Sequence, residues 1–509
     1  MDSNISQFMA TRGALRALAT GIALVIASAP LADAHTLTWP FLRAGRGAQV
    51  FPQPTTPLPA ASMQSNATMA GQVLPVTNCH DDGPGSLRAV VTAAADHDTV
   101  DLSALTCSSI TLSSGAIAVG VDNLTLQGPG AARLAIDGGG LDRVFFDRHG
   151  GDLIFRDLTI RHGTIHLTTL GITGGACIAD AGYLTLERSV VRDCIASAEG
   201  VYGGGVNAGV LTMLESTITG NTAYGDSPGT GTAASGGGAY AVYAYLTDST
   251  ITGNFASHRA DPPRTSYDIG GGLMVGVSGS VVRSTIDHNT AASRGGGIFS
   301  IDDLVIDNST LSANTAQTES GGGLFMRIPG ILSMNNSTVS GNSAADGGGI
   351  TLSPNGGSLQ SSIVFGNTAS AGAADLSASK TQVLAGDHNI LGAAGPKLTL
   401  PADTLHSDPQ LVPLAANGGF TRTQALPANS PAVDQGSNPS GASVDQRGAG
   451  YPRVIGTNAD IGSFEWAALP LPATTAVPSL SPWAAWWLTL GSLGLGAITL
   501  RRRRHSTEA

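Results

Sequence analysis

Short segments in which apolar and polar residues alternate recur along the middle of the chain, and each is followed by a turn. The stretch STVSGNSAADGGGI at 337–350 shows the repeating unit: an apolar residue flanked by Ser or Thr, an Asn three residues later, then an Ala and a Gly triplet. Alternation with a period of two predicts a short strand with one buried and one exposed face. Similar sequences begin at residues 216, 284 and 309.

Aligned on this asparagine, the repeats place equivalent residues in columns. Neighbouring asparagines are 25–35 residues apart, and the segments between them carry Gly triplets but no helical periodicity. Such a period built from short strands predicts an all-β solenoid in which every coil lies on the previous one, and a parallel β-helix fits it best. The asparagine column comprises Asn221, Asn254, Asn289, Asn314, Asn342 and Asn367.

Equivalent residues of successive coils should lie about 4.8 Å apart, which is the spacing of paired strands. Asparagine tolerates the left-handed turn conformation, and its amide can hydrogen-bond the amide of the next coil. We therefore interpret the column as a structural Asn ladder that holds a corner of the solenoid, and we assign it no catalytic role.

The Gly triplets show where the coils vary in length. From each triplet to the next column asparagine the distance is 18–21 residues, whereas from a column residue to the following triplet it ranges from 5 to 16. The insertions therefore fall at one corner, and insertions in solenoids map to one face, often the binding face. The longest are consecutive, at 195–202, 222–235 and 255–269, and we expect them to stack side by side.

These loops supply the candidate ligand-binding residues. Aromatic residues beside charged ones suit sugar binding, although Pro262, Pro263 and the mixed charges are equally typical of an ordinary solvated loop. The candidates are Tyr224, Asp226, His258, Arg259, Asp261, Arg264, Tyr267 and Asp268. No catalytic residue is assigned.

The ends of the chain indicate export and anchoring. Arg12 and Arg16 precede an apolar run and a small-residue cleavage motif, which predicts a signal peptide over 1–34, with an uncleaved anchor as the alternative. Residues 483–500 are uncharged and long enough to cross a bilayer, and Arg501–Arg504 would hold the C-terminus on the cytoplasmic side. A single apolar span does not match the C-terminal β-barrel of an autotransporter. We expect an exported protein of the cell envelope or cell surface, anchored at its C-terminus.

Composition and local signals set the remaining boundaries. Ser86 is a good N-cap for a short amphipathic helix running to about Asp96, which would close the open end of the solenoid. The expected divisions are a signal peptide at 1–34, a Pro/Ala-rich linker at 35–75, an N-terminal cap with the first coils at 76–150, β-helix repeats at 151–395, a C-terminal region at 396–466, a linker with a sorting motif at 467–482, and a transmembrane span with a basic cluster at 483–504.

Charge and motifs exclude several functions. The net charge is −11 and Lys380 and Lys397 are the only lysines, so the sequence lacks the electrostatic footprint of a nucleic-acid-binding protein. Nucleophile elbows, zinc motifs and phosphate-binding loops are absent from the sequence, and no helix follows the Gly triplets that would make them phosphate cradles. We expect no metal and no cofactor.

Four stretches resemble known families of bacterial β-helix proteins. The coils over 150–370 resemble the right-handed parallel β-helix of pectate-lyase-like and polymorphic outer-membrane proteins, and TNCHDDGPGSLRAVVTAAADHDTVDLS (77–103) is similar to their CSLREA-type N-terminal segment. The wording of 408–466 closely resembles the choice-of-anchor Q region, and VPSLSPW (477–483) with the apolar span and RRRR is similar to an IPTL-type sorting signal. The resemblance implies a surface β-helix whose tail meets a sorting or processing enzyme. A plain C-terminal membrane anchor is the alternative.

The cysteines of an exported chain are expected to pair. Cys194 occupies the asparagine corner, and Cys177 lies in a slot that other coils fill with Val206 or Leu273, so the two could meet across adjacent rungs. Cys79 and Cys107 bracket the expected cap and could fasten it. Buried thiols are the alternative for both pairs.

Two functions from different classes remain. The first is adhesion, or binding of a glycan or a surface partner, through the stacked loops. The second is a polysaccharide lyase or glycoside hydrolase acting on an extracellular glycan, which would need carboxylates that converge from adjacent coils. Because few carboxylates occur in the long loops, we favour binding.

Overall fold

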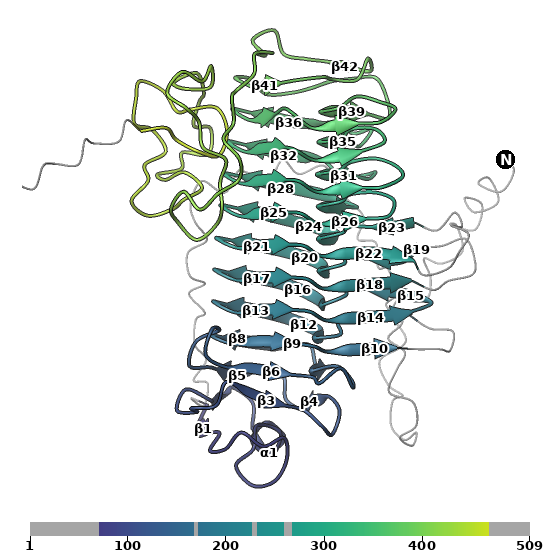
Figure 1. Ribbon diagram of the computed structural model, residues 1–509, viewed down its shortest axis with the longest axis vertical. Coiled ribbons are helices and arrows are strands. Elements are labelled where there is room, and N and C mark those ends of the chain that lie inside the picture. Colours follow the sequence, from purple (N-terminus) through teal and green to yellow (C-terminus); the bar gives the residue numbers. More distant parts are fainter. Residues whose placement is uncertain (1–70, 167–171, 226–231, 259–266, 468–509) are drawn as a thin grey trace, which may run out of the picture.

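The computed structural model describes residues 71–166, 172–225, 232–258 and 267–467, and most of them form a stack of coils (Figure 1). The described strands pair in parallel from one coil to the next, so that the Thr217–Thr219 strand, for example, lies against Thr250–Thr252 in register. In-register parallel pairing is what a solenoid of stacked coils requires. The expectation of an all-β parallel β-helix of the right-handed type is confirmed.

Four sheets, called A to D, run along the stack. Sheet A contains β1 (Val73–Pro75), β2 (Asp98–Asp101), β4 (Ile117–Val119), β5 (Leu124–Gln127), β7 (Phe145–Asp147), β8 (Asp152–Arg156), β12 (Ile178–Glu187), β16 (Val206–Leu214), β20 (Ala239–Thr247), β24 (Leu273–Val282), β27 (Ile298–Ser300), β28 (Asp303–Asp307), β31 (Leu324–Met326), β32 (Leu332–Asn335), β35 (Ile350–Leu352), β36 (Gly357–Gln360) and β39 (Leu376–Ala378).

Sheet B follows sheet A along each coil. It contains β3 (Ser109–Thr111), β6 (Ala135–Asp137), β9 (Thr159–Arg161), β13 (Val190–Arg192), β17 (Thr217–Thr219), β21 (Thr250–Thr252), β25 (Thr285–Asp287), β29 (Thr310–Ser312), β33 (Thr338–Ser340), β37 (Ile363–Val364) and β41 (Ile390–Leu391). The central apolar residue of these strands points inward; Ile218, Ile251 and Ile286, for example, are fully buried.

Sheets C and D complete the coils. Sheet C contains β10 (Thr164–His166), β14 (Ile195–Ala198), β18 (Thr222–Gly225), β22 (Phe255–His258), β26 (Thr290–Ala291), β30 (Thr315–Ala316), β34 (Ser343–Ala344) and β38 (Thr368–Ala369). Sheet D contains β11 (Ile172–Thr173), β15 (Gly200–Tyr202), β19 (Thr232–Ser235) and β23 (Tyr267–Ile269), and it exists only where the coils carry the long insertions. Near the C-terminal end, β40 (Gln382–Val383) pairs with β42 (Leu398–Thr399).

The asparagine column forms a continuous hydrogen-bonded ladder inside the corner between sheets B and C. The Asn221 Nδ2 donates to the Asn254 Oδ1 at 3.0 Å, and the pattern repeats from coil to coil as far as Asn367. Each asparagine also donates to a backbone carbonyl, and each Oδ1 accepts from the backbone N–H of the preceding ladder residue. The ladder ends on Asp375, whose Oδ1 accepts from Asn367 at 2.9 Å.

One part of the sequence interpretation is corrected here. The left-handed conformation lies on the residue before each asparagine, at Gly220, His288 and Ala313 among others, and the asparagines themselves are not in it. A left-handed residue turns the chain sharply, and the next side chain then points into the interior. The asparagines hold the corner through their amides, while their neighbours supply the turn.

The corner between sheets A and B is built in the same way from serines. The backbone N–H of Ser216 donates to the Ser249 Oγ at 3.1 Å, and the Ser249 N–H donates to the Ser284 Oγ at 3.1 Å. The preceding residues, Glu215 and Asp248, again have positive φ. The complete ladder comprises Ser189, Ser216, Ser249, Ser284, Ser309, Ser337 and Ser362, and it ends on Asn389.

The third glycine of each triplet is explained by the asparagine ladder. A Cβ on Gly297 would lie 3.0 Å from the Asn314 side chain, and one on Gly238 would lie 2.9 Å from Asn254. The asparagines therefore reach across the interior and pack on a backbone that has no side chain. The third glycine of the triplet and the asparagine side chain of the same coil therefore contact each other.

Both expected disulfides are present, Cys79–Cys107 and Cys177–Cys194. Ile178 pairs with Val206, so Cys177 is equivalent to Gly205. The predicted equivalence of Cys177 with Val206 is therefore wrong by one residue. Cys177 thus occupies the third-glycine position and Cys194 the asparagine position, and the bond crosses the interior within one coil. A disulfide here replaces the glycine–asparagine contact of the other coils.

The two ends of the coil stack differ. At the N-terminal end lies helix α1 (Leu87–Ala93), whose N-cap Ser86 accepts a hydrogen bond from the Ala89 N–H at 3.2 Å (Figure 1). Leu87 and Val91 of this helix are buried in the main core. The first strand, β1, begins within the segment expected to be a linker.

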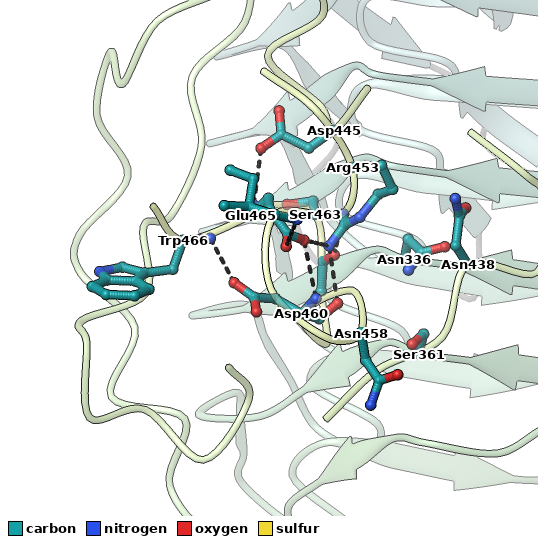
Figure 2. Close-up of polar contacts among 12 residues, drawn as sticks. Asn336, Ser361, Asn438, Asp445, Arg453, Asn458, Asp460, Ser463, Glu465 and Trp466 are labelled. Carbon is teal, nitrogen blue, oxygen red and sulfur yellow. Dashed lines mark hydrogen bonds and ion pairs between the residues drawn. The ribbon is translucent and has the colours of Figure 1, made fainter. Parts of the chain in front are cut away.

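At the other end, residues after β42 leave the stack and pack as irregular chain against the outer face of sheet B (Figure 1). Gln446 is buried there; its Nε2 donates to the Thr285 Oγ1 at 2.9 Å, and its Oε1 accepts from the Thr310 Oγ1 at 2.6 Å. The fully buried Arg453 pairs with Glu465 at 3.0 Å (Figure 2). Its guanidinium also donates to the Asn308 Oδ1 at 3.1 Å.

Within the described ranges, no helix has the length and apolar character needed to cross a bilayer. The expected signal peptide at 1–34, most of the first linker, the second linker and the span at 483–504 lie outside those ranges. These four assignments stay predictions.

The asparagine ladder gives the first prediction. Asn314→Ala leaves the Asn289 backbone N–H and Nδ2 without the oxygen that accepts from both, and it removes one of the two donors to the Asn342 Oδ1; all of these groups are buried. Buried polar groups without partners cost about 1–3 kcal/mol each, so the variant should lose about 3 kcal/mol of stability in urea denaturation. Asn458→Ala, at an exposed site, is the control and should lose less than about 0.5 kcal/mol. Equal losses would contradict the role of the ladder.

The register of the disulfide gives the second prediction. Cys177→Gly with Cys194→Asn should rebuild the regular contact, because Cys194 already donates its N–H to the Asn221 Oδ1 at 3.1 Å. Under reducing conditions this double variant should melt at a higher temperature than Cys177→Ser with Cys194→Ser. Thermal unfolding followed by circular dichroism measures the difference, and a lower melting temperature for the Gly/Asn pair would refute the equivalence.

Candidate functional site

We call the first three residues that each coil contributes to sheet A its leading segment. This segment presents one column of side chains outward. The residues on either side of this column, such as Leu273 and Val275, are buried in the core, so the central residue points to the opposite face. The column comprises Phe146, Ala179, Asn207, Tyr240, Met274, Phe299, Phe325, Thr351 and Ser377.

Aromatic contacts dominate the middle of this column. The rings of Phe299 and Phe325 are stacked, with centroids 5.1 Å apart and planes 8° from parallel. Met274, Phe299 and Ile269 form a small apolar cluster outside the main core, and Tyr240 packs against it. These large side chains are held on the outer surface of the solenoid by each other.

Beyond Phe325 the column becomes the floor of a groove. Two hollows follow one another, of 350 Å³ and 690 Å³, and they share Ser320 and Asp346. The first is lined by Phe325, Thr351 and Arg327, among others. The hydroxyls of Thr351 and Ser377 are 3.0 Å apart on the floor. The site is therefore a groove along the solenoid axis that begins on aromatic rings and continues over hydroxyls.

Charged side chains stand along both walls of the groove. The Arg294 guanidinium lies 4.6 Å above the Tyr267 ring and 5.3 Å from the Phe325 ring, and it is ion-paired with Glu319. Glu319 also lines the larger hollow, together with Lys397, whose Nζ donates to the Ser379 carbonyl at 3.1 Å. The groove thus offers cations, one carboxylate held in an ion pair, and an aromatic surface.

Asp346 lies between the two hollows and contributes a second carboxylate. Its Oδ1 accepts a hydrogen bond from the Ala373 N–H at 3.0 Å, which fixes the loop of the next coil. Glu319 and Asp346 come from adjacent coils, because Ser320 pairs with Asp346. Two carboxylates of neighbouring coils therefore face one groove.

The predicted loop residues lie on an arm formed by sheets C and D. Asp226, Arg259, Asp261 and Arg264 are outside the described residues. The four that are described, Tyr224, His258, Tyr267 and Asp268, lie in strands β18, β22 and β23. The described parts of the long insertions stack, since β18 pairs with β22 and β19 with β23.

The structure gives these four residues different surroundings. Asp268 is fully buried, and its Oδ2 lies 2.6 Å from the His258 Nδ1, which ties sheet C to sheet D. Burial raises the pKa of the Asp268 carboxyl, and the His258 hydrogen bond opposes that rise. Tyr224 packs edge-to-face on Phe255. Tyr267 is exposed and lies under Arg294, and it is the member of this set that reaches toward the groove.

Sequence reasoning missed the groove residues Arg294, Phe325 and Lys397. A signal for the floor was present: the second residue after each Gly triplet is Tyr240, Phe299 or Phe325 in several coils. The sequence interpretation considered only the apolar residue directly after each triplet, which points inward. It did not consider the next residue, which points outward. The basic and acidic wall residues have no such periodic signal, because they come from turns of different length.

A pair of buried carboxyls lies nearer the N-terminal end of sheet A. Asp147 and Asp180 are in register on adjacent coils, are almost fully buried, and each has an Oδ2 without a hydrogen-bond partner. Burial raises the pKa of Asp180 to about 7; the Gly182 N–H lowers it, whereas Asp147 and Asp152 add to the rise. Burial also raises the pKa of Asp147.

Among residues of known position, no group of three or more His, Cys, Asp or Glu side chains is arranged to hold a metal ion. The Asp147 and Asp180 carboxyls are therefore protonatable groups in the interior of the solenoid, next to the outward column of sheet A.

Comparison with known proteins gives little beyond the architecture. No protein-family model matches the chain, and no curated protein sequence matches it. Among solved structures, the crystal structure of pectate lyase Pel9A is similar, with a TM-score of 0.47 and 13% sequence identity over 79% of this chain and 98% of that chain. The class of protein, a parallel β-helix, rests on the strand pairing described above.

The carboxyl pair predicts a pH dependence of stability. The pKa of Asp180 in the folded protein lies above its ordinary value of 3.8, so its stabilising contribution is present below about pH 4 and is lost as the pH rises through 7. Asp180→Asn removes this loss. Its unfolding free energy should match that of the wild type at pH 4 and exceed it by up to about 4 kcal/mol at pH 8.

Urea denaturation at several pH values measures this difference. Asp82→Asn, at an exposed carboxyl before helix α1, is the control and should follow the wild-type curve. A constant offset between Asp180→Asn and the wild type across the range would show that folding does not raise the pKa of Asp180.

Proposed function

We propose that the protein is an exported β-helix that binds an extended glycan in the axial groove of sheet A. The observation that carries the proposal is the sequence of surfaces along one groove: the Phe325 ring, which stacks on the buried Phe299 and lines the first hollow, then the paired hydroxyls of Thr351 and Ser377 on the floor. Sugar rings present C–H faces that pack on aromatic rings, and hydroxyls that need polar partners. A groove along the axis suits a polymer better than a small molecule.

The charges of the groove favour a glycan that carries carboxylates. The chain has a net charge of −11, yet Arg294, Arg327 and Lys397 line these hollows. Arg294 is held in place by its aromatic neighbours and Glu319, so a bidentate hydrogen bond to a carboxylate would cost little further ordering. Tyr267 extends the same surface toward the stacked loops.

Export and anchoring are part of the proposal. The signal-peptide pattern at 1–34 and the apolar span at 483–500 support an envelope location, and two disulfides are typical of proteins that fold in an oxidising compartment. The rigid coil stack would then display the groove outside the cell, where adhesion to a glycan or a surface partner would act. A sorting or processing enzyme remains the expected partner of the tail.

A second function, glycan cleavage, is favoured by one observation. Glu319 and Asp346 come from adjacent coils and face the same groove as Arg294. Lyases and hydrolases require such carboxylates, but both are engaged here, one by Arg294 and one by the Ala373 N–H. Binding without cleavage is therefore the function we propose first.

The test is a glycan array run with the purified full-length chain, beside assays for reducing ends and for unsaturated uronates. Phe325→Ala and Lys397→Ala should each weaken binding of the retained glycan at least tenfold, about 1.4 kcal/mol, because each removes one contact surface of the groove. Phe420→Ala removes an exposed ring in the C-terminal region and should leave the affinity unchanged.

Product formation decides between the two functions. If the chain releases products and Glu319→Gln with Asp346→Asn abolishes that release, the protein is an enzyme. If no glycan is retained, or if Phe325→Ala and Phe420→Ala behave alike, the groove is not a glycan site.

A further inference from the structure

A second outward surface of sheet A lies beyond a bend from the groove. It belongs to the trailing segment, the later residues that each coil contributes to this sheet. Two neighbouring columns point outward on it, because the residues between them, such as Leu184, Leu211 and Ala244, are buried. Over strands β12 to β24 these columns comprise Tyr183, Val210, Tyr243 and Ser278, and Thr185, Thr212, Tyr245 and Ser280. These eight residues are called the tyrosine face.

Three tyrosines on this face are exposed although large apolar side chains are usually covered. The exposed fractions are 54% for Tyr183, 37% for Tyr243 and 38% for Tyr245, and Leu214 beside them is 39% exposed. A contiguous exposed aromatic surface on a sheet marks an interaction site more often than an accident of packing.

None of the eight residues of the tyrosine face is charged. Charged residues border the face: Asp152 and Asp303 at the two ends of the first column, and Glu187, ion-paired with Arg156, beside Thr185. Between these carboxylates the polar groups are hydroxyls of Thr, Ser and Tyr. Such a surface is complementary to a neutral ligand that is itself rich in hydroxyls, and it offers no ion pair to an anionic polymer or a charged protein.

The spacing of the rings adds a geometric argument. Tyr183 pairs with Val210, and Val210 pairs with Tyr243, so the two tyrosines stand in one column two coils apart. Two strand spacings amount to about 9.6 Å. This is close to the repeat of an extended β-linked disaccharide, in which every second ring presents the same face. Tyr245 widens the surface on the same strand as Tyr243.

We propose that the tyrosine face binds the flat surface of a neutral, extended β-linked polysaccharide. Rings of successive disaccharides would lie on Tyr183 and Tyr243, and the hydroxyls of Thr212 and Ser280 would face the sugar hydroxyls. This site is separate from the groove, which offers cations to a carboxylate-bearing chain. The rod would then hold two glycans of different charge on two surfaces of one sheet.

The test measures retention of the full-length chain on microcrystalline cellulose and on insoluble chitin. Tyr183→Ala, Tyr243→Ala and Tyr245→Ala combined should lower the affinity about 100-fold or more. The same three positions changed to Phe keep the rings and should stay within about threefold of the wild type. Circular dichroism and the melting temperature check that both triple variants are folded.

Controls separate this site from the groove and from self-association. Lys397→Ala should leave retention unchanged, so failure of the groove proposal and of this one can be told apart. Sedimentation velocity without polysaccharide tests whether a second copy covers the face.

Loss of retention in the Ala variant alone supports the proposal. Equal retention of all variants, no retention of the wild type, or dimers that the Ala triple variant abolishes without any retention would each overturn it.

Discussion

The structure depends on how the chain turns corners while its backbone stays hydrogen-bonded. A parallel stack leaves each coil two tight bends whose polar groups face the interior, where unpaired groups are costly. The serine and asparagine ladders provide partners at both bends, and the residue before each supplies the positive φ. Because every ladder residue bonds to the next coil, a coil is stable only when its neighbours are in register.

The same constraint fixes what can vary. Inward columns are mostly apolar, with Asp147 and Asp180 as an exception, corner columns are mostly Ser or Asn, and the third glycine must be bare because the asparagine packs on it. Cys177 and Cys194 show how strict this is, since they replace both partners of that contact at once. Only the outward columns and the loops between sheets C and A are free to carry function. Both proposed surfaces are made of outward columns.

The repeating part of the molecule was predictable because it is periodic. The strands around Ile218 and Val339, the asparagine ladder and the stacked insertions follow from residues that recur at fixed positions. The groove did not follow, since Arg294, Asp346 and Lys397 come from turns of unequal length, and only the fold brings them to one side. The docking of the C-terminal region on sheet B was equally unpredictable, because Gln446 and Arg453 bind partners in the coils that lie more than 130 residues earlier in the chain.

This docking also explains why the two sheets differ in their exposed surfaces. The outward threonines of sheet B, such as Thr285 and Thr310, are occupied by Gln446 and Ser463 over the later coils. The corresponding outward columns of sheet A have no such cover among the described residues. Their aromatic side chains must therefore be stabilised by each other, as at Phe299 and Phe325, or remain exposed, as at Tyr183 and Tyr243. The exposed tyrosine rings on these two uncovered columns cost free energy in water, and a ligand that covers them recovers that free energy.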